Sequence, residues 1–354
     1  MSFASMGAYR LKSLLLVQAH FGQRLDIYAG EAPPGSSIRT IAHQDMAFEG
    51  VQNYYFPKHL LVQGLPFWRF ISCKVLLLDL NPRMPQVWLL LLARRALHRK
   101  TILWGHAWPR SGRASRSDSI RNAMRSLATS LVTYTNTQAA ELRDKHPGKR
   151  VTPAPNAIYA HREFGFEPGS TRNSIVYVGR MTYEKRILDV VEAFELIAGD
   201  FPDVELLMVG DGEALGEVRK RLMASSHTQR MSALGHVDDY ASIRSIYARS
   251  VVSVSPGYVG LSITQSLTFG VPMIISVPEP HSPEIEAADW GINALSFESQ
   301  NVADLARTMR NVLENRVHWA EKGDAISKNA SAHYSAETMA DGLIAALEEE
   351  LSCA

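Results

Sequence analysis

The sequence has 354 residues, of which 46% are hydrophobic and 21% are charged. This composition is ordinary for a globular protein, and the length suits two domains. The two cysteines, Cys73 and Cys353, are too far apart and too few for a disulfide framework or a metal-ligand cluster. The longest apolar run, 87–93, is far shorter than the roughly 18 residues of a membrane-spanning helix. We therefore expect neither a disulfide-rich secreted protein nor a membrane-spanning one, and place the chain in a reducing cytoplasm.

The charge is unevenly divided along the chain. Residues 1–155 contain 21 Lys and Arg against 8 Asp and Glu, whereas residues 156–354 contain 16 against 28. The net charge of +1 therefore hides a basic half and an acidic half. This asymmetry favours two domains with different partners, and the basic half suits phosphate groups, nucleic acid or an anionic membrane surface.

In the first half, hydrophobic periodicity predicts helices that alternate with short apolar strands. The helices are expected at 11–20, 86–98 and 117–131, and the strands at 24–29, 73–78, 101–105 and 131–134. The stretch 147–155 contains three prolines and a glycine, which is typical of a linker.

The same alternation resumes in the second half. Strands are expected at 174–178, 204–209, 231–234, 251–255 and 273–276, with helices at 187–198, from 213 and at 240–248. Such alternation predicts an α/β protein with two parallel, doubly wound sheets. We place an N-terminal domain at 1–155, a C-terminal domain at 156–330 and a final helix at 331–354, with a return of that helix to the first domain as one option.

Two cations follow the strand at 174–178. Gly179 and Arg180 come directly after the strand, and Lys185 lies five residues further along. Parallel sheets bind their ligands at the carboxyl ends of the strands, where two cations can hold a diphosphate from both sides. A solvated basic loop is the alternative interpretation of the same spacing.

A glycine-rich stretch follows the strand at 251–255. No charged residue occurs between Ser255 and Pro272. Gly257 and Gly260 permit close approach of the backbone to a ligand, and the first amides of a following helix would face that ligand. An anion can be held there without a charged side chain, by N–H groups and the helix dipole. An ordinary glycine turn is the alternative.

Histidines and a carboxylate follow other predicted strands. His106 follows a strand of the first half, where an imidazole suits proton transfer or hydrogen bonding, although lone histidines are more often structural. His281 and Glu284 follow the strand at 273–276, and Glu284 suits the first turn of a helix equally well. The helix at 86–98 leads into a cluster of cations, which favours either a buried helix with a basic end or contact with anionic lipid. That cluster comprises Arg94, Arg95, His98, Arg99 and Lys100.

Together these features resemble the family 4 glycosyltransferases, which have the GT-B fold of two Rossmann-like domains facing a cleft. The resemblance is strong over 174–300 and fainter over 74–156. The motifs that carry it are Gly179-Arg180 with Glu184-Lys185, Val209 to Gly212, Leu234 to Val237, Gly270-Val271-Pro272 and Pro283-Glu284. It implies transfer of a sugar from a nucleotide-sugar donor with retention at the anomeric carbon, and without a metal or a cofactor.

The resemblance also implies roles for individual residues. Arg180 and Lys185 would hold the donor diphosphate and stabilise the charge of the leaving group, and His106 would lie near the donor sugar. The implied catalytic residues are His106, Arg180 and Lys185. The implied acceptor-binding residues are Trp104, His106 and Arg110. The implied donor-binding residues are Gly179, Arg180, Lys185, Gly210, His236, Val237, Gly257, Gly260, Leu261, Ser262, Gln265, His281 and Glu284.

The chain departs from the family pattern in the glycine loop and at its start. Typical members carry two glutamates eight positions apart, at the places that Gly257 and Gln265 occupy here. Gln265 can still hydrogen-bond a ribose diol through its amide, whereas Gly257 cannot supply the usual contact to the donor sugar. We expect His281 or Glu284 to supply that contact. Only residues 1–8 precede the first helical motif, so the first strand is expected to be truncated or very short.

We predict a hexosyltransferase that uses a UDP- or GDP-linked sugar and builds a surface polysaccharide, such as an O-antigen, a capsule or an exopolysaccharide, on a lipid-pyrophosphate acceptor. The basic first half favours a peripheral position on the inner face of the cytoplasmic membrane. A catalytically weak GT-B subunit that binds nucleotide or a partner glycosyltransferase is the alternative, because the paired glutamates are missing. A GT-B epimerase needs carboxylates that the glycine loop lacks. Nucleic-acid binding has only the charge in its favour and is not expected.

Overall fold

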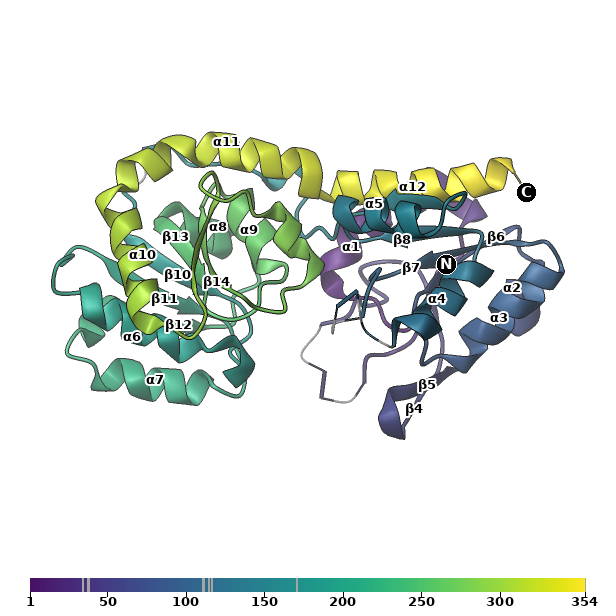
Figure 1. Cartoon of the computed structure of the whole chain (residues 1–354), viewed down its shortest axis with the longest axis horizontal. Coiled ribbons are helices and arrows are strands. Elements are labelled where there is room, and N and C mark those ends of the chain that lie inside the picture. The colour runs from purple at the N-terminus through teal and green to yellow at the C-terminus, as the bar shows by residue number, and fades with distance from the viewer. Residues whose placement is uncertain are drawn as a thin grey trace. The chain divides into compact units, whose positions relative to one another are not determined.

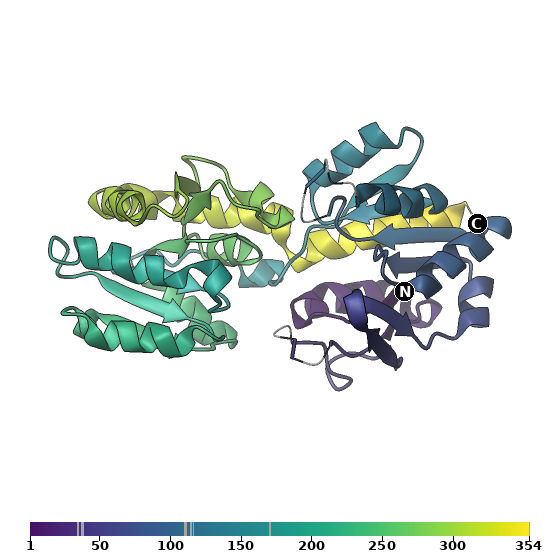
Figure 2. The same ribbon diagram turned by 60° about the horizontal axis from the view of Figure 1, so that its bottom comes forward.

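The computed structural model describes residues 1–33, 35–36, 39–109, 112–113, 115, 117–169 and 171–353. The chain forms two compact domains, the first from residues 1–160 with 334–354 and the second from 161–333. Figures 1 and 2 show that each domain is a sheet with helices on both of its faces. The prediction of an α/β chain with two doubly wound parallel sheets is confirmed. Within the described ranges, no helix is long and apolar enough to cross a bilayer.

Over its described residues, the first domain contains a seven-stranded sheet in the order β3-β2-β1-β6-β7-β8-β9, with parallel neighbours throughout. Its strands are β1 (Ser2–Phe3), β2 (Tyr28–Ala29), β3 (Glu49–Gly50), β6 (Val75–Asp79), β7 (Lys100–Trp104), β8 (Ser130–Thr133) and β9 (Arg150–Pro153). An antiparallel hairpin of β4 (Asn53–Phe56) and β5 (Leu60–Gln63) is separate from this sheet. The helices are α1 (Leu11–Phe21), α2 (Phe67–Ser72), α3 (Pro85–Ala96), α4 (Asp118–Leu127), α5 (Asn136–Lys145) and α12 (Ala336–Ser352).

Side chains of this sheet alternate between its two faces, as the pleat requires. Leu77 and Ile102 pack with α1 and α12, whereas Leu76 and Leu103 pack with α3, α4 and α5. The α12 side of the contact includes Met339, Leu343 and Leu347. The last helix of the chain therefore completes the core of the domain in which the chain begins, and Figure 2 shows it in yellow along that domain.

Two sequence predictions in the first domain are wrong. The stretch 147–155, predicted as a linker, contains β9, which pairs with β8 at the edge of the sheet. The proline within β9, Pro153, fits because an edge strand tolerates a residue that lacks an N–H donor. The strand predicted at 24–29 is reduced to β2, because residues 22–24 form a 3-10 turn that begins at Gly22 with a φ of 55°.

Over its described residues, the second domain contains a six-stranded parallel sheet in the order β12-β11-β10-β13-β14-β15. Its strands are β10 (Ser174–Val178), β11 (Glu205–Val209), β12 (Met231–Gly235), β13 (Ser250–Ser255), β14 (Met273–Val277) and β15 (Ala294–Glu298). The helices are α6 (Ile187–Ile197), α7 (Leu215–Ala224), α8 (Tyr240–Ala248), α9 (Ser262–Thr268), α10 (Val302–Glu314) and α11 (Arg316–Tyr334). The chain order reverses between β10 and β13, so their carboxyl ends mark the switch point of this sheet.

The core of the second domain explains its strand sequences. Strands β10 and β14 are buried along most of their length, and a parallel strand covered on both faces is expected to be nearly all apolar. Helices α6, α7 and α10 contribute Phe194, Val218 and Met309 to the largest apolar cluster. Helices α8 and α9 meet each other where the rings of Tyr247 and Phe269 stack at 5.1 Å.

Candidate functional site

The central strands of the second domain bring the predicted ligand-binding loops together. Strands β10 and β13 pair in parallel, with Ile175 opposite Val252. The loops that follow them, 179–186 and 256–261, therefore leave the sheet at the same edge. In doubly wound sheets, ligands bind in the crevice outside the carboxyl ends at such a reversal of strand order. The predicted residues in these two loops are Gly179, Arg180, Lys185, Gly257, Gly260 and Leu261.

The loop after β10 presents two cations in different surroundings. Arg180 is exposed, and its carbonyl oxygen accepts a 2.7 Å hydrogen bond from the hydroxyl of Tyr177. Lys185 closes a 3-10 turn, Tyr183–Lys185, and is only 9% exposed. A buried ammonium group is unfavourable unless other groups hold its charge, so the partners of Lys185 decide whether this position is stable.

Both cations contact Tyr258 in the glycine loop. Arg180 donates from Nη2 to the Tyr258 hydroxyl over 3.1 Å. The Lys185 ammonium lies 3.4 Å from the centroid of the Tyr258 ring and donates to the Tyr258 carbonyl oxygen. A cation this close to an aromatic face is attracted by the ring quadrupole. Arg180 and Lys185 thus converge on one residue, which sequence reasoning missed because neither charge nor spacing distinguishes it.

The next cation, Arg186, stabilises the loops from inside the domain. Its backbone is left-handed, with a φ of 48°, between the turn and α6. Its guanidinium donates to the carbonyl oxygen of Pro256, donates to the Ser276 hydroxyl over 2.8 Å and pairs with Glu279 at 2.8 Å. These partners belong to the glycine loop, to β14 and to the loop after β14, so Arg186 holds three neighbouring segments together.

Gly257 is required for the packing of the two loops. A Cβ at this position would lie 2.9 Å from the Glu184 carbonyl oxygen and 3.0 Å from the Cα of Lys185. The sequence suggested that Gly257 lets the backbone approach a ligand, whereas the neighbour that fills this space is the turn of residues 183–185. The glutamate that the family pattern places here has no room on this backbone.

A second pair of predicted glycines lies at the ends of β10 and β11. Gly210 has a φ of 141°, and a Cβ on it would lie 1.8 Å from the Gly179 carbonyl oxygen. The Gly179 N–H in turn donates to the Val209 carbonyl oxygen over 3.0 Å. Gly210 therefore packs so closely on the Gly179 backbone that no side chain could replace its hydrogen.

The helix α9 begins directly after the glycine loop. Its first turn leaves Leu261, Ser262 and Gln265 partly exposed, while Ile263 and Thr264 are buried. The first amides of a helix lack intrahelical acceptors, so such a turn suits an anion. The predicted residues of this turn therefore lie on its open side.

A side chain from the loop after β14 holds the glycine loop in place. His281 accepts a 2.9 Å hydrogen bond at Nδ1 from the Val259 N–H, and the Ser282 N–H donates to the Val259 carbonyl oxygen over 2.9 Å. Burial lowers the pKa of His281, so the ring is neutral at pH 7 and carries its proton on Nε2. Glu284 is buried in the 3-10 turn Pro283–Ala287 that follows.

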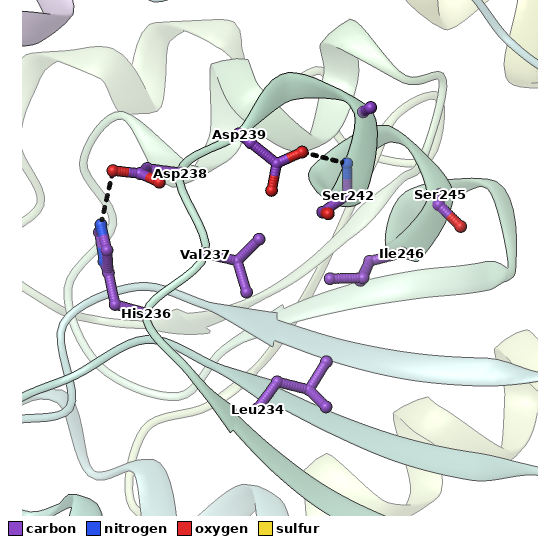
Figure 3. A pocket seen from close by; sticks show the side chains of 9 residues that line it. Leu234, His236, Val237, Asp238, Asp239, Ser242, Ser245 and Ile246 are labelled. Carbon is purple, nitrogen blue, oxygen red and sulfur yellow. Dashed lines mark hydrogen bonds and ion pairs between the residues drawn. The ribbon is translucent and has the colours of Figure 1, made fainter.

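A pocket of about 600 Å³ opens at the carboxyl end of β12, on the same edge of the same sheet. Its lining consists of Leu234, His236, Val237, Asp238, Asp239, Ala241, Ser242, Ser245 and Ile246. Figure 3 shows Leu234, Val237 and Ile246 as the apolar side chains of this lining. An apolar floor with polar groups around it suits a planar ring with polar edges.

Some polar side chains at the rim of this pocket already interact with other groups of the protein. Asp239 caps α8 by accepting a 2.8 Å hydrogen bond from the Ser242 N–H, and His236 Nε2 lies 3.6 Å from Asp238 (Figure 3). The predicted donor-binding residues His236 and Val237 thus line a pocket in the structure. Neither this rim nor any other described part of the chain groups three His, Cys, Asp or Glu side chains so that they could hold a metal ion.

In the first domain, His106 follows β7 at the carboxyl edge of the sheet. Its ring packs edge-on against Tyr134 at 4.7 Å. The His106 side chain reaches solvent, yet desolvation by the surrounding protein atoms, together with the charges of Arg10 and Arg121, lowers its pKa to about 4. The imidazole is therefore neutral at physiological pH, and it can both accept and donate a hydrogen bond. This suits contact with a sugar hydroxyl.

Trp104, predicted to bind an acceptor, is instead fully buried. Its indole lies edge-on to Phe3 at 5.6 Å and carries the Arg10 guanidinium 4.5 Å from the ring centroid. Arg10 donates in turn to the Tyr134 hydroxyl over 2.9 Å. Trp104 therefore has no surface with which to touch an acceptor and acts as packing for Arg10. Arg110, the remaining predicted acceptor residue, lies outside the described residues.

Asp79 is a half-buried carboxyl group at the same edge that the sequence did not single out. It ends β6, and its Oδ2 accepts a 2.6 Å hydrogen bond from the Ala4 N–H just after β1. Burial raises the pKa of Asp79 to about 6, against the lowering effects of that hydrogen bond and of Arg10. The strand order reverses between β1 and β6, so Asp79 stands at the switch point of the first sheet.

The basic cluster predicted at the end of α3 divides between core and surface. Arg94 is fully buried, where it donates to the Thr101 hydroxyl over 2.9 Å and to the Lys74 carbonyl oxygen over 3.2 Å, so it cannot face a membrane. Exposed members of the cluster are Arg95, His98 and Arg99. Exposed apolar side chains of the same domain include Tyr54, Tyr55 and Phe56 on the hairpin, Trp68 on α2, and Leu89, Leu92 and Leu97 on or just after α3; others are Leu15, Leu16, Leu60, Val62 and Ile120. Helix α3 packs against both α2 and β5, so these elements are neighbours.

Residues 162–333, nearly the whole second domain, match the model of the family described as glycosyl transferases group 1. The second domain resembles this family from end to end. It is the domain in which Arg180 and Lys185 meet the glycine loop. Comparison with curated proteins gives no match.

The complete chain also resembles solved structures. HepE of Anabaena, solved with UDP, has 13% identity and a TM-score of 0.72, covering 98% of this chain and 99% of its own. A glycosyltransferase of Rickettsia africae ESF-5 has 14% identity and a TM-score of 0.70, covering 99% and 98%. Sucrose-phosphate synthase of Thermosynechococcus elongatus has 15% identity and a TM-score of 0.68, covering 100% and 99%. The chain has the GT-B fold. At these identities the GT-B likeness concerns the fold, and the chemistry has to be argued from the site.

Proposed function

We propose that the chain is a glycosyltransferase that moves a sugar from a nucleotide-sugar donor to an acceptor, with retention at the anomeric carbon and without a metal or a cofactor. The observation that carries this proposal is the convergence of Arg180 and Lys185 on the glycine loop, at the switch point of a domain that matches glycosyl transferases group 1. Within family 4, which the motifs of 174–300 favour, Gly257 and Gln265 would place the chain among members that lack the paired glutamates.

The donor would lie along the carboxyl edge of the second sheet. Its base fits the pocket lined by His236 and Val237, and its diphosphate fits near Arg180, Lys185 and the first turn of α9. Gln265 on that turn would hydrogen-bond the ribose. HepE of Anabaena was solved with UDP and with UDP-glucose, which supports a UDP-linked sugar here, with a GDP-linked sugar as the alternative.

The chemistry needs stabilisation of charge rather than a protein nucleophile. When the bond between the anomeric carbon and the diphosphate breaks, negative charge grows on the leaving oxygen, where Arg180 and Lys185 would stabilise it. The acceptor hydroxyl attacks from the face that the diphosphate leaves, and its proton passes to the departing phosphate. His106, which is neutral at pH 7, would orient a sugar by hydrogen bonding.

The first domain supports an acceptor at a membrane. Residues 1–155 carry 21 Lys and Arg against 8 Asp and Glu, which favours a lipid-pyrophosphate glycan and anionic headgroups over a neutral acceptor. The exposed Trp68, Leu89 and Leu92 stand on neighbouring helices together with Arg95. Apolar side chains beside cations are typical of segments that lie on anionic lipid. We therefore propose surface-polysaccharide synthesis (O-antigen, capsule or exopolysaccharide) by a peripheral protein of the inner face of the cytoplasmic membrane.

Thermal-shift and transfer measurements test the proposal. Wild type, Arg180→Ala and the exposed control Arg162→Ala would be screened with UDP- and GDP-sugars and a lipid-pyrophosphate sugar acceptor. We expect one donor to raise the melting temperature of the wild type and of Arg162→Ala but not of Arg180→Ala, and to be consumed in transfer or hydrolysis. No shift with any donor, or an equal shift in Arg180→Ala, would overturn the diphosphate assignment.

A catalytically weak GT-B subunit is the second candidate, favoured by the lack of room for a side chain at Gly257. Such a subunit would bind UDP or GDP in calorimetry without turning over any nucleotide sugar. Turnover would appear only after addition of a partner glycosyltransferase. Turnover by the pure protein alone would exclude this alternative.

A further inference from the structure

Tyr258 occupies the point at which both candidate diphosphate-binding cations meet. Its hydroxyl accepts from Arg180 over 3.1 Å, and its ring lies 3.4 Å from the Lys185 ammonium. The Tyr258 carbonyl oxygen also accepts from Lys185, so the buried lysine is held by both the backbone and the ring of this residue. Tyr258 is itself half-buried, between the two loops of the switch-point crevice.

The surrounding contacts fix where Tyr258 can be. The residue before it, Gly257, cannot carry a side chain, because a Cβ there would meet the backbone of the 183–185 turn. The residue after it, Val259, is buried and held through both its N–H and its carbonyl oxygen by His281 and Ser282. Of the residues from 257 to 259, Tyr258 is therefore the one that presents a polar side chain to the cations.

We infer that Tyr258 is a specificity-determining residue of the donor site, which contacts the transferred sugar and competes with the diphosphate for Arg180 and Lys185. This inference rests on the proposed function. No side chain can stand at Gly257, and the adjacent Tyr258 presents a phenol beside both cations, where the diphosphate and its sugar would lie. A phenol is neutral and both donates and accepts, so it suits a sugar hydroxyl.

The competition follows from the contacts that Arg180 and Lys185 make with Tyr258. A diphosphate prefers the same guanidinium and ammonium groups that Tyr258 engages here, and charge-assisted bonds to phosphate are stronger than bonds to a phenol. A diphosphate that takes the Nη2 donor of Arg180 therefore displaces the Tyr258 hydroxyl. The displaced hydroxyl becomes free for the sugar of the donor, whereas the diphosphate product carries no sugar and gains no such contact. Tyr258 thus favours the intact donor over the product.

Calorimetry and steady-state kinetics on Tyr258→Phe and Tyr258→Ala test this inference. The alanine variant removes the hydroxyl from Arg180 and the ring from Lys185, and we expect it to bind the nucleoside diphosphate about 3- to 10-fold more tightly than the wild type. Its kcat/KM for the nucleotide sugar should fall about 10-fold or more through the lost sugar contact. The phenylalanine variant keeps the ring on Lys185, so its diphosphate affinity should stay within about 2-fold of the wild type, while its KM for the sugar donor rises.

The outcomes separate this inference from the proposed function. If the wild type binds neither UDP, GDP nor their sugars, the proposed function fails and the inference fails with it. If the wild type binds and transfers but both variants match it in diphosphate affinity and in kcat/KM, the inference alone is overturned. A variant that merely disturbed the fold would lose diphosphate and donor affinity together, which also contradicts the expected opposite changes. Tyr258→Phe, the smaller change, keeps the test decisive if the alanine variant fails to fold.

Discussion

Val259 donates its backbone N–H to Nδ1 of His281 over 2.9 Å, and this hydrogen bond holds the glycine loop after β13 to the loop after β14. Val259 is fully buried, so an N–H that lost this acceptor would have no water to replace it. The neighbouring Ser282 N–H donates to the Val259 carbonyl oxygen over 2.9 Å. The place of Tyr258, and with it the arrangement of both cations, depends on this pair of hydrogen bonds.

Replacement of His281 by alanine should therefore lower the free energy of unfolding by about 1–3 kcal/mol, because it leaves the buried Val259 N–H without an acceptor. Nucleotide affinity should fall as well, since the glycine loop is no longer held. His281→Asn is the matched control: its Oδ1 is bonded to Cγ, as Nδ1 is in histidine, and can accept the same N–H. Urea unfolding and nucleotide calorimetry would compare the two variants. If alanine and asparagine behaved alike, the hydrogen bond would not be what fixes the loop.

The same histidine should make the stability depend on pH. Burial lowers the pKa of His281 in the folded protein. Below about pH 6.5, His281 is therefore protonated more readily in the unfolded chain than in the folded chain, which favours unfolding. The contribution of His281 to stability is complete above about pH 6.5 and is lost as the pH falls below that value. His281→Asn has no such group, so the wild type should lose stability relative to this variant between about pH 6.5 and pH 5. A difference in unfolding free energy that stays constant from pH 8 to pH 5 would contradict this prediction.

Gly257→Glu restores the residue of the family pattern, yet we expect it to harm the protein. The added Cβ would lie 2.9 Å from the Glu184 carbonyl oxygen, and relief requires a shift of the turn that carries Lys185. The loss of stability should be about 1–3 kcal/mol, with most of it already present in Gly257→Ala, and nucleotide affinity should fall. Gly216→Ala in α7 is the control, because its Cβ meets nothing within 4 Å and alanine favours a helix. Wild-type or improved kcat/KM in Gly257→Glu would show that the loop opens readily.

The sequence was sufficient for the sheets and for the pair of cations because these depend on local patterns. Strand–helix alternation predicts parallel sheets, and parallel sheets place Arg180, Lys185 and the glycine loop at one edge. Tyr258 was not predictable, because its contacts depend on how closely two loops approach. That approach is set by the absence of a side chain at Gly257 and by the left-handed backbone of Arg186.

Two errors have the same physical origin, a local signal overridden by tertiary structure. Prolines at 147–155 are typical of a linker, but at the sheet edge β9 accommodates Pro153, where a missing N–H donor is tolerated. Trp104 ends a strand beside His106, and the resemblance implied that it binds an acceptor there. Alternation along the strand turns Trp104 into the core instead, where its indole supports Arg10.

Ionisation of the Asp79 carboxyl group lowers the free energy of unfolding of the protein. Its pKa rises from 3.8 to about 6 through burial, so the folded chain holds a proton that the unfolded chain has released between about pH 4 and pH 6. The stability that the protonated Asp79 provides is complete below the pKa that Asp79 has in the unfolded chain. It is lost as the pH rises through about 6. A shift of this size corresponds to at most roughly 3 kcal/mol at neutral pH.

Asp79→Asn should therefore raise the free energy of unfolding at pH 7 by about 1–3 kcal/mol, because the amide oxygen still accepts from the Ala4 N–H and no charge is buried. At pH 4 the variant and the wild type should be equally stable. Urea unfolding from pH 4 to pH 7 measures this, with the exposed Asp45→Asn as the control that should follow the wild type at every pH. If Asp79→Asn were less stable than the wild type at pH 7, or if its gain in unfolding free energy were the same at pH 4 as at pH 7, ionisation of Asp79 would not be what destabilises the fold. A more stable variant that has lost sugar transfer would instead show that this carboxylate is kept for the reaction, since functional groups are commonly retained at the expense of stability.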